Sequence, residues 1–138
     1  KAVYRSGQGV MEETEETFNL DTLEAKAKVG DVEAQYEMGW RHALGMEVDL
    51  DDDVAVEWLE KAAAVGHMLA QNNMGARYYT GDGVEQNLKK AYRLFFLAAN
   101  QGDRKAGKNL DAVARQLSET DLEFLRTEMG EAKFNSSE

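Results

Sequence analysis

The sequence predicts an all-α protein built from repeated helical hairpins, and three observations support that prediction. Proline is absent, and residues that favour helices (Ala, Leu, Glu, Lys, Gln, Met) dominate a chain with 43% apolar residues. A unit of 36 residues recurs without insertion or deletion. Within each unit, apolar residues recur at the spacing of the buried face of a helix.

The repeat is clearest when Asp31–Gly66 is aligned with His67–Gly102. No gap is needed, and most identities fall on small residues. That many matches in one register indicate a recurring structural unit. The matched pairs are Ala34 and Ala70, Gln35 and Gln71, Met38 and Met74, Gly39 and Gly75, Gly45 and Gly81, Val48 and Val84, Ala55 and Ala91, Ala62 and Ala98, Ala63 and Ala99, and Gly66 and Gly102.

Partial units flank this pair. Asp103, Ala106 and Leu110 continue the register, and "YRSGQGV" (4–10) echoes "YYTGDGV" (78–84). We therefore expect the tail of one repeat, two full repeats and a divergent last one, with only the last turn of a first helix at the front. The chain is interpreted either as the C-terminal part of a longer array or as one that has lost its N-terminus.

Each unit is expected to contain two helices. Asp31 and Asp103 are placed to cap the first helix through a side-chain oxygen; His67, at the same position, is a poorer cap and is expected to face solvent. Gly45 and the stretch 81–83 end that helix with a left-handed turn. The second helix is expected to present to the core Val54, Trp58, Ala62 and Val65, or Leu88, Leu94, Leu97 and Ala98.

Gly39 and Gly75 lie inside the first helices, where glycine costs about 1 kcal/mol of helix propensity relative to alanine. Because they recur at one place in the repeat, we expect them to let the paired helices approach closely, opposite Ala62 and Ala98. The alternative is that they are tolerated glycines on the surface.

The motifs "VEAQYEMG", "EWLEKAAAVG" and "LAQNNMG…YYTGDGV…AYRLFFLAANQG" resemble the Sel1-like repeat, a tetratricopeptide-like helical hairpin of 36 or more residues. The resemblance covers nearly all of residues 1–117. It implies a right-handed α-solenoid, an α/α superhelix of stacked hairpins. On that basis the chain divides into a partial N-terminal repeat (1–30), two Sel1-like repeats (31–66 and 67–102) and a divergent repeat with a C-terminal capping helix (103–138).

Two departures from the family pattern concern the first turn and the last repeat. "GMEV" (45–48) stands in the first repeat where the family has Gly-x-Gly-Val, so its inter-helix turn is expected to differ. The third repeat has Asp111 where the others have Gly39 and Gly75. "SETD" (118–121) then offers an N-cap for a last helix, which we expect to close the solenoid with Leu122, Leu125 and Met129.

The acidic stretch "EVDLDDDVAVEWLE" (47–60) raises the question of a calcium loop, because its acids stand at the spacing of an EF-hand. The sixth position of the loop is Val54, where an EF-hand needs glycine for a sharp turn. The repeat register places Asp51–Asp53 at the start of a helix, where free N–H groups and the macrodipole favour negative charge. We therefore predict a helix start and no metal site.

Composition and motifs argue against catalysis and against any cofactor. Only His42 and His67 could act as bases at neutral pH, and His42 is expected to pack between helices. Motifs for a serine nucleophile, zinc or phosphate binding are absent, and so is cysteine, which excludes disulfides and thiolate sites.

Charge and hydropathy exclude further classes of partner. Net charge is −10, with residues 1–60 at −11 and residues 61–103 at +2, so nucleic acid is an unsuitable partner. No apolar run approaches the length that spans a membrane, so membrane insertion is not expected.

The resemblance implies a concave face lined by the first helix of each repeat, which is the usual ligand groove of such solenoids. Trp40 could instead pack on a neighbouring repeat, the basic residues could be an ordinary solvated face, and Trp58 is expected in the core. Carried over by position, the partner-binding residues are Glu33, Tyr36, Trp40, Asn72, Tyr79, Lys105, Lys108 and Arg115.

We therefore expect a non-catalytic scaffold or adaptor, a monomer, that binds a protein or peptide with an apolar anchor and an acidic end. Two alternatives stay open: a structural spacer or self-association element of a larger assembly, and a saccharide-binding module, since Trp and Tyr rings suit sugars. The sequence leaves the partner and the compartment open, and both bacterial cytoplasm and periplasm are compatible with it.

Overall fold

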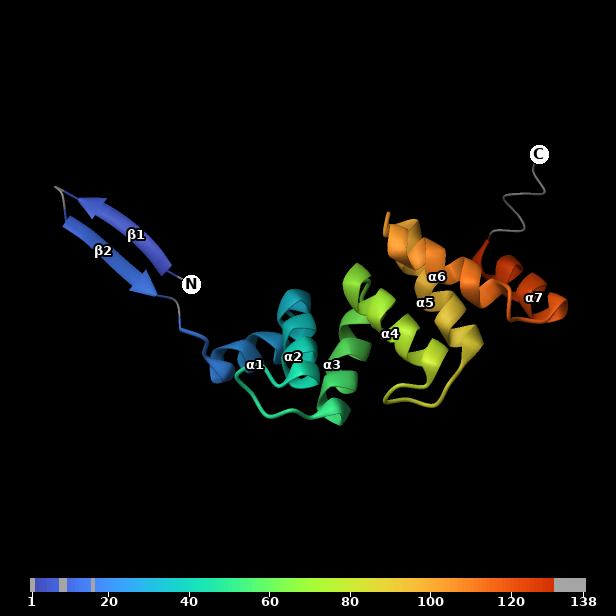
Figure 1. Cartoon of the computed structure of the whole chain (residues 1–138), viewed down its shortest axis with the longest axis horizontal. Coiled ribbons are helices and arrows are strands. Elements are labelled where there is room, and N and C mark those ends of the chain that lie inside the picture. The colour runs from blue at the N-terminus through green and yellow to red at the C-terminus, as the bar shows by residue number, and fades with distance from the viewer. Residues whose placement is uncertain (1, 8–9, 16, 131–138) are drawn as a thin grey trace.

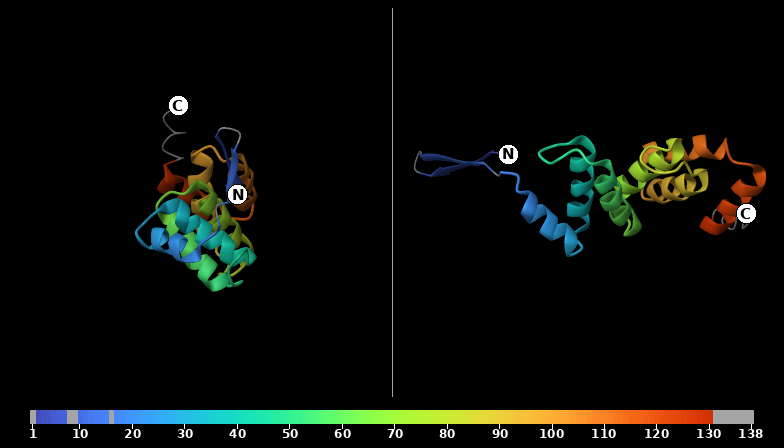
Figure 2. Two further views of the ribbon diagram at one scale, coloured as in Figure 1. Left: turned by 90° about the vertical axis from the view of Figure 1, so that its left-hand side faces the viewer. Right: turned by 90° about the horizontal axis from the view of Figure 1, so that it is seen from below.

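The computed structural model describes residues 2–7, 10–15 and 17–130, with side chains from residue 17 onward. A β-hairpin is followed by helices stacked along one long axis (Figures 1 and 2). The elements are β1 (Ala2–Gly7), β2 (Val10–Glu15), α1 (Leu20–Lys28), α2 (Val32–Leu44), α3 (Asp52–Ala64), α4 (Met68–Thr80), α5 (Leu88–Asn100), α6 (Arg104–Ala114) and α7 (Glu119–Met129).

The helices pack in chain order. Each of α1 to α6 contacts its neighbours in sequence, and α7 folds back onto α5. The pairs α2–α3 and α4–α5 lie within residues 31–66 and 67–102. The predicted all-α solenoid is confirmed for the helical part; the domain boundaries stay predictions, and residues 131–138 of the last unit lie outside the described residues.

The N-terminal segment differs from the sequence expectation. Residues 4–10 were expected to end a first helix, but β1 and β2 pair as antiparallel strands, with Ala2 opposite Glu15 and Gly7 opposite Val10. Two extended segments of this length satisfy each other's backbone groups when they pair as antiparallel strands.

Every helix in the described part of the chain begins with a side-chain cap. In each case an oxygen or ring nitrogen accepts a hydrogen bond from a backbone N–H near the start of the helix, which satisfies one of its free donors. The capping residues are Asn19, Asp31, Asp51, His67, Asn87, Asp103 and Ser118.

Several local predictions are confirmed by these caps. Asp31, Asp103 and Ser118 start α2, α6 and α7, and Leu125 of the last helix is fully buried. Gly45 ends α2 at φ 68°, in the left-handed region that favours glycine. The expectation that His67 faces solvent is wrong, because its side chain is 7% exposed and its Nδ1 accepts from Ala70 N at 3.2 Å.

The helices of each hairpin approach closely at Gly39 and Gly75. A methyl group added to Gly39 would lie 2.6 Å from Leu59 Cδ2, and one added to Gly75 would lie 2.7 Å from Phe95 Cε1. The close approach is therefore confirmed, but the facing residues are not Ala62 and Ala98. Those alanines are fully buried about one turn further along the second helix.

The buried face of the second helices is rotated from the predicted one. Ala62 and Ala98 are buried as predicted, but Val65 is 62% exposed and Leu97 is 40% exposed. Trp58 is only half-buried and packs against a small cluster formed by α1 and α2. The buried face combines alanines with the larger side chains that fill the space opposite Gly39 and Gly75. Its members are Ala55, Leu59, Ala62 and Ala63 in α3, and Ala91, Tyr92, Phe95 and Ala98 in α5.

Two kinds of polar contact join successive repeats. The buried amides of Gln35 and Gln71 donate to the backbone oxygens of Ala27 and Ala63, at 3.1 and 3.3 Å, near the end of the preceding helix. Because buried polar groups need partners, these bonds favour one relative position of neighbouring repeats.

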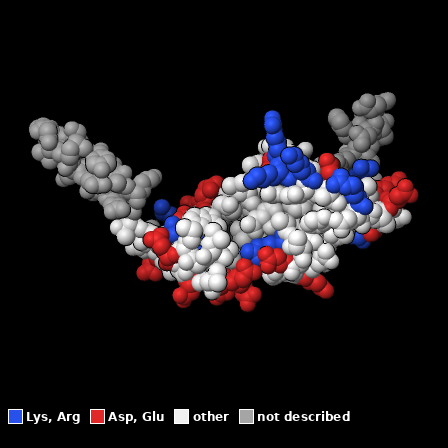
Figure 3. All heavy atoms as spheres, viewed as in Figure 1, with Lys and Arg blue, Asp and Glu red and all other residues white. Residues whose placement is uncertain are grey.

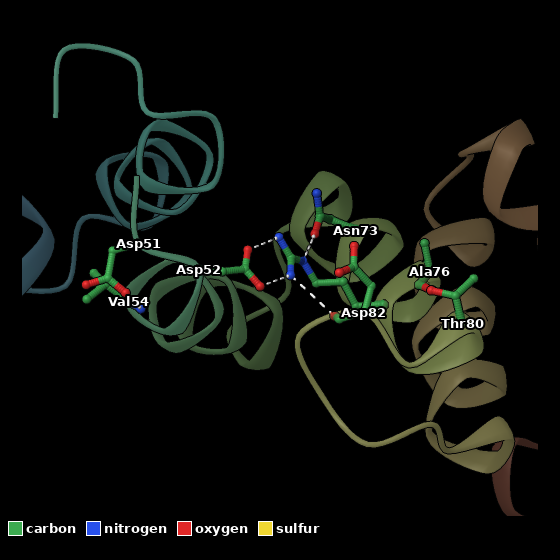
Figure 4. Close-up of polar contacts among 8 residues, drawn as sticks. Asp51, Asp52, Val54, Asn73, Ala76, Thr80 and Asp82 are labelled. Carbon is green, nitrogen blue, oxygen red and sulfur yellow. Dashed lines mark hydrogen bonds and ion pairs between the residues drawn. The ribbon is translucent and has the colours of Figure 1, made fainter. Parts of the chain in front are cut away.

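The second contact is an ion pair between Asp52 of α3 and Arg77 of α4 (Figure 4). Arg77 Nη1 and Nη2 donate to the two carboxylate oxygens, each at 2.9 Å, and Arg77 Nε donates to Asn73 at 3.1 Å. The hydrogen bonds from Arg77 lower the pKa of Asp52; partial desolvation opposes this shift and the guanidinium charge adds to it. Asp51 caps the same helix, so two of the three aspartates at this helix start, Asp51 and Asp52, bind other groups of the protein.

We expect Gly75→Ala to lower the free energy of unfolding by about 1–3 kcal/mol, because the fully buried Phe95 ring has no room to move. Gly107→Ala is the matched control, since nothing lies within 4 Å of a methyl group there, and it should raise the free energy of unfolding by about 1 kcal/mol. Urea denaturation measures both; equal effects would contradict the close approach.

Asp52→Asn should lower the free energy of unfolding by up to about 1 kcal/mol, since the carboxylate is 44% exposed and the pair is partly screened. Asp53→Asn is the control: it removes a charge from the same helix turn, where Asp53 has no side-chain partner within the described residues. Because folding lowers the pKa of Asp52, its stabilisation is present above the ordinary Asp value of about 3.9 and is lost as pH falls through the lower folded value. When the free energy of unfolding is measured across that acid range, Asp52→Asn should lack this contribution to the pH dependence, and Asp53→Asn should retain it.

Candidate functional site

Two adjoining hollows lie around the start of α4, between the first helices of successive repeats. Met68 and Leu69 line both of them, and Leu69 is 47% exposed. We call the first the α4 hollow; it encloses about 370 Å³ and is lined by Tyr36, Met68, Leu69, Asn72, Asn73, Asp103, Arg104 and Lys105. We call the second the turn hollow; it encloses about 420 Å³ and is lined by Val32, Glu33, Val65, Gly66, His67, Met68, Leu69 and Gln101.

Half of the predicted site residues line these hollows. Tyr36, Asn72 and Lys105, from three different helices, meet around the α4 hollow, and Glu33 lines the turn hollow. The other four line neither hollow. They are Trp40, Tyr79, Lys108 and Arg115, and the assignment of all eight residues to a binding face stays a prediction.

The residues outside the hollows have varied surroundings. Trp40 is half-buried, with the guanidinium carbon of Arg41 at 4.8 Å from its ring centre. The Tyr79 hydroxyl accepts a hydrogen bond from Gln116. Lys108 and Arg115 are exposed along α6.

A stack of Tyr36 on His67 separates the two hollows. The ring centres are 4.4 Å apart, and His67 Nε2 lies 3.2 Å from Glu33 Oε2. Because Nδ1 accepts from the backbone of α4, the neutral imidazole carries its proton on Nε2, which donates to Glu33. Burial raises the pKa of Tyr36, and the nearby Glu33 carboxylate raises it further, so the phenol stays protonated at neutral pH.

The α4 hollow offers mainly hydrogen-bond donors. The side-chain oxygens of Asn72 and Asn73 already accept from Asn109 and Arg77, so their NH₂ groups are left without a partner within the described residues. Asp103 uses a carboxylate oxygen to cap α6. With the cations beside it, the hollow is suited to an acceptor with negative charge.

Basic and acidic side chains gather in different places on the molecular surface (Figure 3). Lys and Arg gather at the upper edge, over the region of α5 and α6, and Asp and Glu line the lower edge around the α2–α3 loop (Figure 3). The exposed bases of α6 are Arg104, Lys105, Lys108 and Arg115. The α4 hollow is therefore lined by two of the exposed bases of a chain that is acidic overall.

Most residues that line the hollows were not among the predicted site residues, and these include Met68, Asn73, Arg104 and His67. Met68 and Arg104 directly follow the predicted cap positions His67 and Asp103, so helix starts that meet at one junction were the available signal. No sequence signal indicated that His67 would be buried, because its neighbour Tyr36 belongs to the preceding repeat.

The other chemical candidates have structural roles. His42 Nδ1 lies 2.9 Å from the backbone oxygen of Asp49, so this side chain holds the α2–α3 loop rather than packing between helices. Among the described residues, no group of three or more His, Cys, Asp or Glu side chains is arranged to hold a metal. No helix in that same part of the chain is both long and apolar enough to cross a membrane.

Stacked helical hairpins joined by tight turns define the class of helical-repeat solenoids. Within that class, the Sel1 repeat family model matches residues 32–67 and 69–103, about half of the chain. The chain therefore belongs to the Sel1 repeat family, whose members are generally non-catalytic.

Solved structures agree with this assignment. A protective antigen of uropathogenic Escherichia coli with an SLR fold is 30% identical, with a TM-score of 0.67 over 83% of this chain and 26% of its own. A Sel1 repeat protein from Oxalobacter formigenes is 27% identical, with a TM-score of 0.62 over 78% of this chain and 97% of its own. The chain thus spans about a quarter of the Escherichia coli antigen. No curated protein sequence matches it.

The stack and the cap at His67 can be separated by substitution. His67→Asn keeps a side-chain oxygen for the α4 backbone, whereas His67→Ala loses both the cap and the stack on Tyr36. We expect the alanine variant to be less stable than the asparagine variant by about 1 kcal/mol in urea denaturation. Equal stability of the two variants would contradict the capping role.

Proposed function

We propose that the chain is a non-catalytic protein-interaction module that binds a peptide segment across the α4 hollow. The observation that supports this best is the combination of exposed Leu69 with unpartnered amide donors and the cations of α6 in one hollow. An apolar side chain of the peptide would cover Leu69, and a carboxylate would meet Arg104 and Lys105.

The energetics favour a short peptide over a large rigid surface. Burying an apolar side chain on Leu69 contributes about 1.5–3 kcal/mol, and charge-assisted hydrogen bonds add to it. Tyr36 and the asparagines are held by neighbours on two helices, so little side-chain freedom is lost on binding.

The family supports the same class of function. Sel1 repeats suggest protein interaction, and the first helices of stacked repeats present a continuous surface on which an extended segment can lie. The saccharide alternative has less support, because neither hollow is lined by Trp40 or Tyr79. The spacer alternative is decided by the experiment below.

A random peptide library displayed on phage and selected on the immobilised chain should yield sequences with an apolar residue near Asp or Glu. Synthetic peptides from that selection should bind about tenfold more weakly to Leu69→Ser and to Arg104→Glu, because each change removes one half of the site. Fluorescence anisotropy with a labelled peptide measures both effects.

The matched controls lie outside the hollows. Leu97→Ser removes a side chain of similar exposure from α5, and Arg126→Glu reverses an exposed charge on α7. Both should leave peptide affinity unchanged. Failure to select any common sequence, or equal losses in test and control variants, would contradict the proposal and favour the spacer reading.

A further inference from the structure

The loop that joins α2 to α3 exposes three large apolar side chains within seven residues. Leu44 is 66% exposed, Met46 is 47% exposed and Leu50 is 70% exposed. We call these three residues the loop patch. They lie outside both hollows described above, so the loop patch is a separate surface.

Hydrogen bonds from the backbone and from His42 determine the path of the loop that carries the loop patch. Leu50 Cβ lies 3.3 Å from the position that a methyl group on Gly45 would take, so Leu50 packs over the C-terminal end of α2. The return of the loop is fixed by Asp51 N donating to the backbone oxygen of His42 at 3.0 Å. The three exposed apolar side chains are therefore carried by a short loop whose two ends are joined by a hydrogen bond.

The second repeat shows that this loop geometry does not require apolar residues. The α4–α5 loop also begins at a left-handed glycine, Gly81, and its Asn87 N donates to the backbone oxygen of Tyr78 at 2.8 Å. Yet the positions that correspond to the loop patch hold the polar residues Thr80, Asp82 and Gln86. The apolar side chains are thus not needed to form the turn.

Carboxylates surround the loop patch. Glu47, Asp49 and Asp53 are exposed beside it, although Glu47 also pairs with Arg41 at 3.0 Å. Glu47 has φ 65°, where the second repeat has Gly83. A left-handed conformation costs a non-glycine residue about 1 kcal/mol, so the acid stands there at a cost in stability. The acidic lower edge of the molecule is visible around this loop (Figure 3).

We propose that the loop patch is a docking site for a basic amphipathic segment of a partner protein, with apolar side chains on the patch and Lys or Arg on the acidic rim. Charge complementarity selects this occupant. An anionic membrane is repelled by the same carboxylates. A second copy would have to offer the exposed Leu69 beside Arg104 and Lys105, so self-association is measured as a competing outcome in the test below.

The test exchanges the loop patch for its counterpart in the second repeat. The variant carries Leu44→Thr, Met46→Asp and Leu50→Gln, and it adds a negative charge. The probe is a short fluorescent peptide of Leu and Lys with helical periodicity. We expect binding to the unmodified chain and about tenfold or weaker binding to the variant despite its extra charge, because apolar burial is lost.

Three comparisons make the result decisive. A peptide with Glu in place of Lys should not bind, and Asp49→Asn with Asp53→Asn should weaken binding several-fold and reduce its salt dependence. Circular dichroism checks the fold, and Leu44→Thr alone serves if the triple variant is unstable. Unchanged affinity of the folded variants, equal binding of the Glu peptide, or a loop patch that drives only self-association in sedimentation or binding to phospholipid vesicles would overturn the proposal.

Discussion

The contact on which the rest of the molecule depends is the one between Gly39 and Leu59, repeated between Gly75 and Phe95. With no Cβ on the glycine, the larger side chain of the facing helix fills the space at the crossing. Phe95 and Leu59 are both fully buried there, and the surrounding alanines let the backbones stay close. Each hairpin therefore has one defined packing, and the repeat can be copied along the chain.

Stacking then determines what the hairpins present to solvent. Gln35 of α2 and Gln71 of α4 each donate a hydrogen bond to the end of the preceding helix. The ion pair of Asp52 with Arg77 joins the two full repeats at the opposite end of α3 and α4. These contacts fix the positions of α2 and α4 relative to the helices that precede them. The α4 hollow exists because three helix starts and faces meet there, so its chemistry comes from several repeats at once.

Local features were the most predictable ones. The caps Asp31, Asp103 and Ser118 and the left-handed Gly45 depend on contacts within a few residues, which the sequence displays directly. The 36-residue register also located the close helix crossings. The residues that face the glycines, Leu59 and Phe95, were missed because packing decides how one helix is rotated against another.

Features that depend on distant neighbours were less predictable. His67 is buried because Tyr36 of the preceding repeat stacks on it, and nothing near His67 in the sequence announces that contact. Of the predicted site, Tyr36, Asn72 and Lys105 meet around one hollow. Tyr36 and Asn72 share a register position on successive first helices, whereas Lys105 stands three residues earlier in its own repeat. The β-hairpin was missed because residues 4–10 resemble a segment of the helical repeat.

The peptide-binding surface that we propose lies on the first helices of the repeats, where successive repeats meet. Backbone amide chemical-shift mapping by NMR, with a peptide selected for binding, tests this most directly. We predict that the largest shifts fall around Tyr36, Leu69 and Arg104, on three helices that are distant in sequence. Shifts confined to the α2–α3 loop, or spread evenly over the chain, would contradict it.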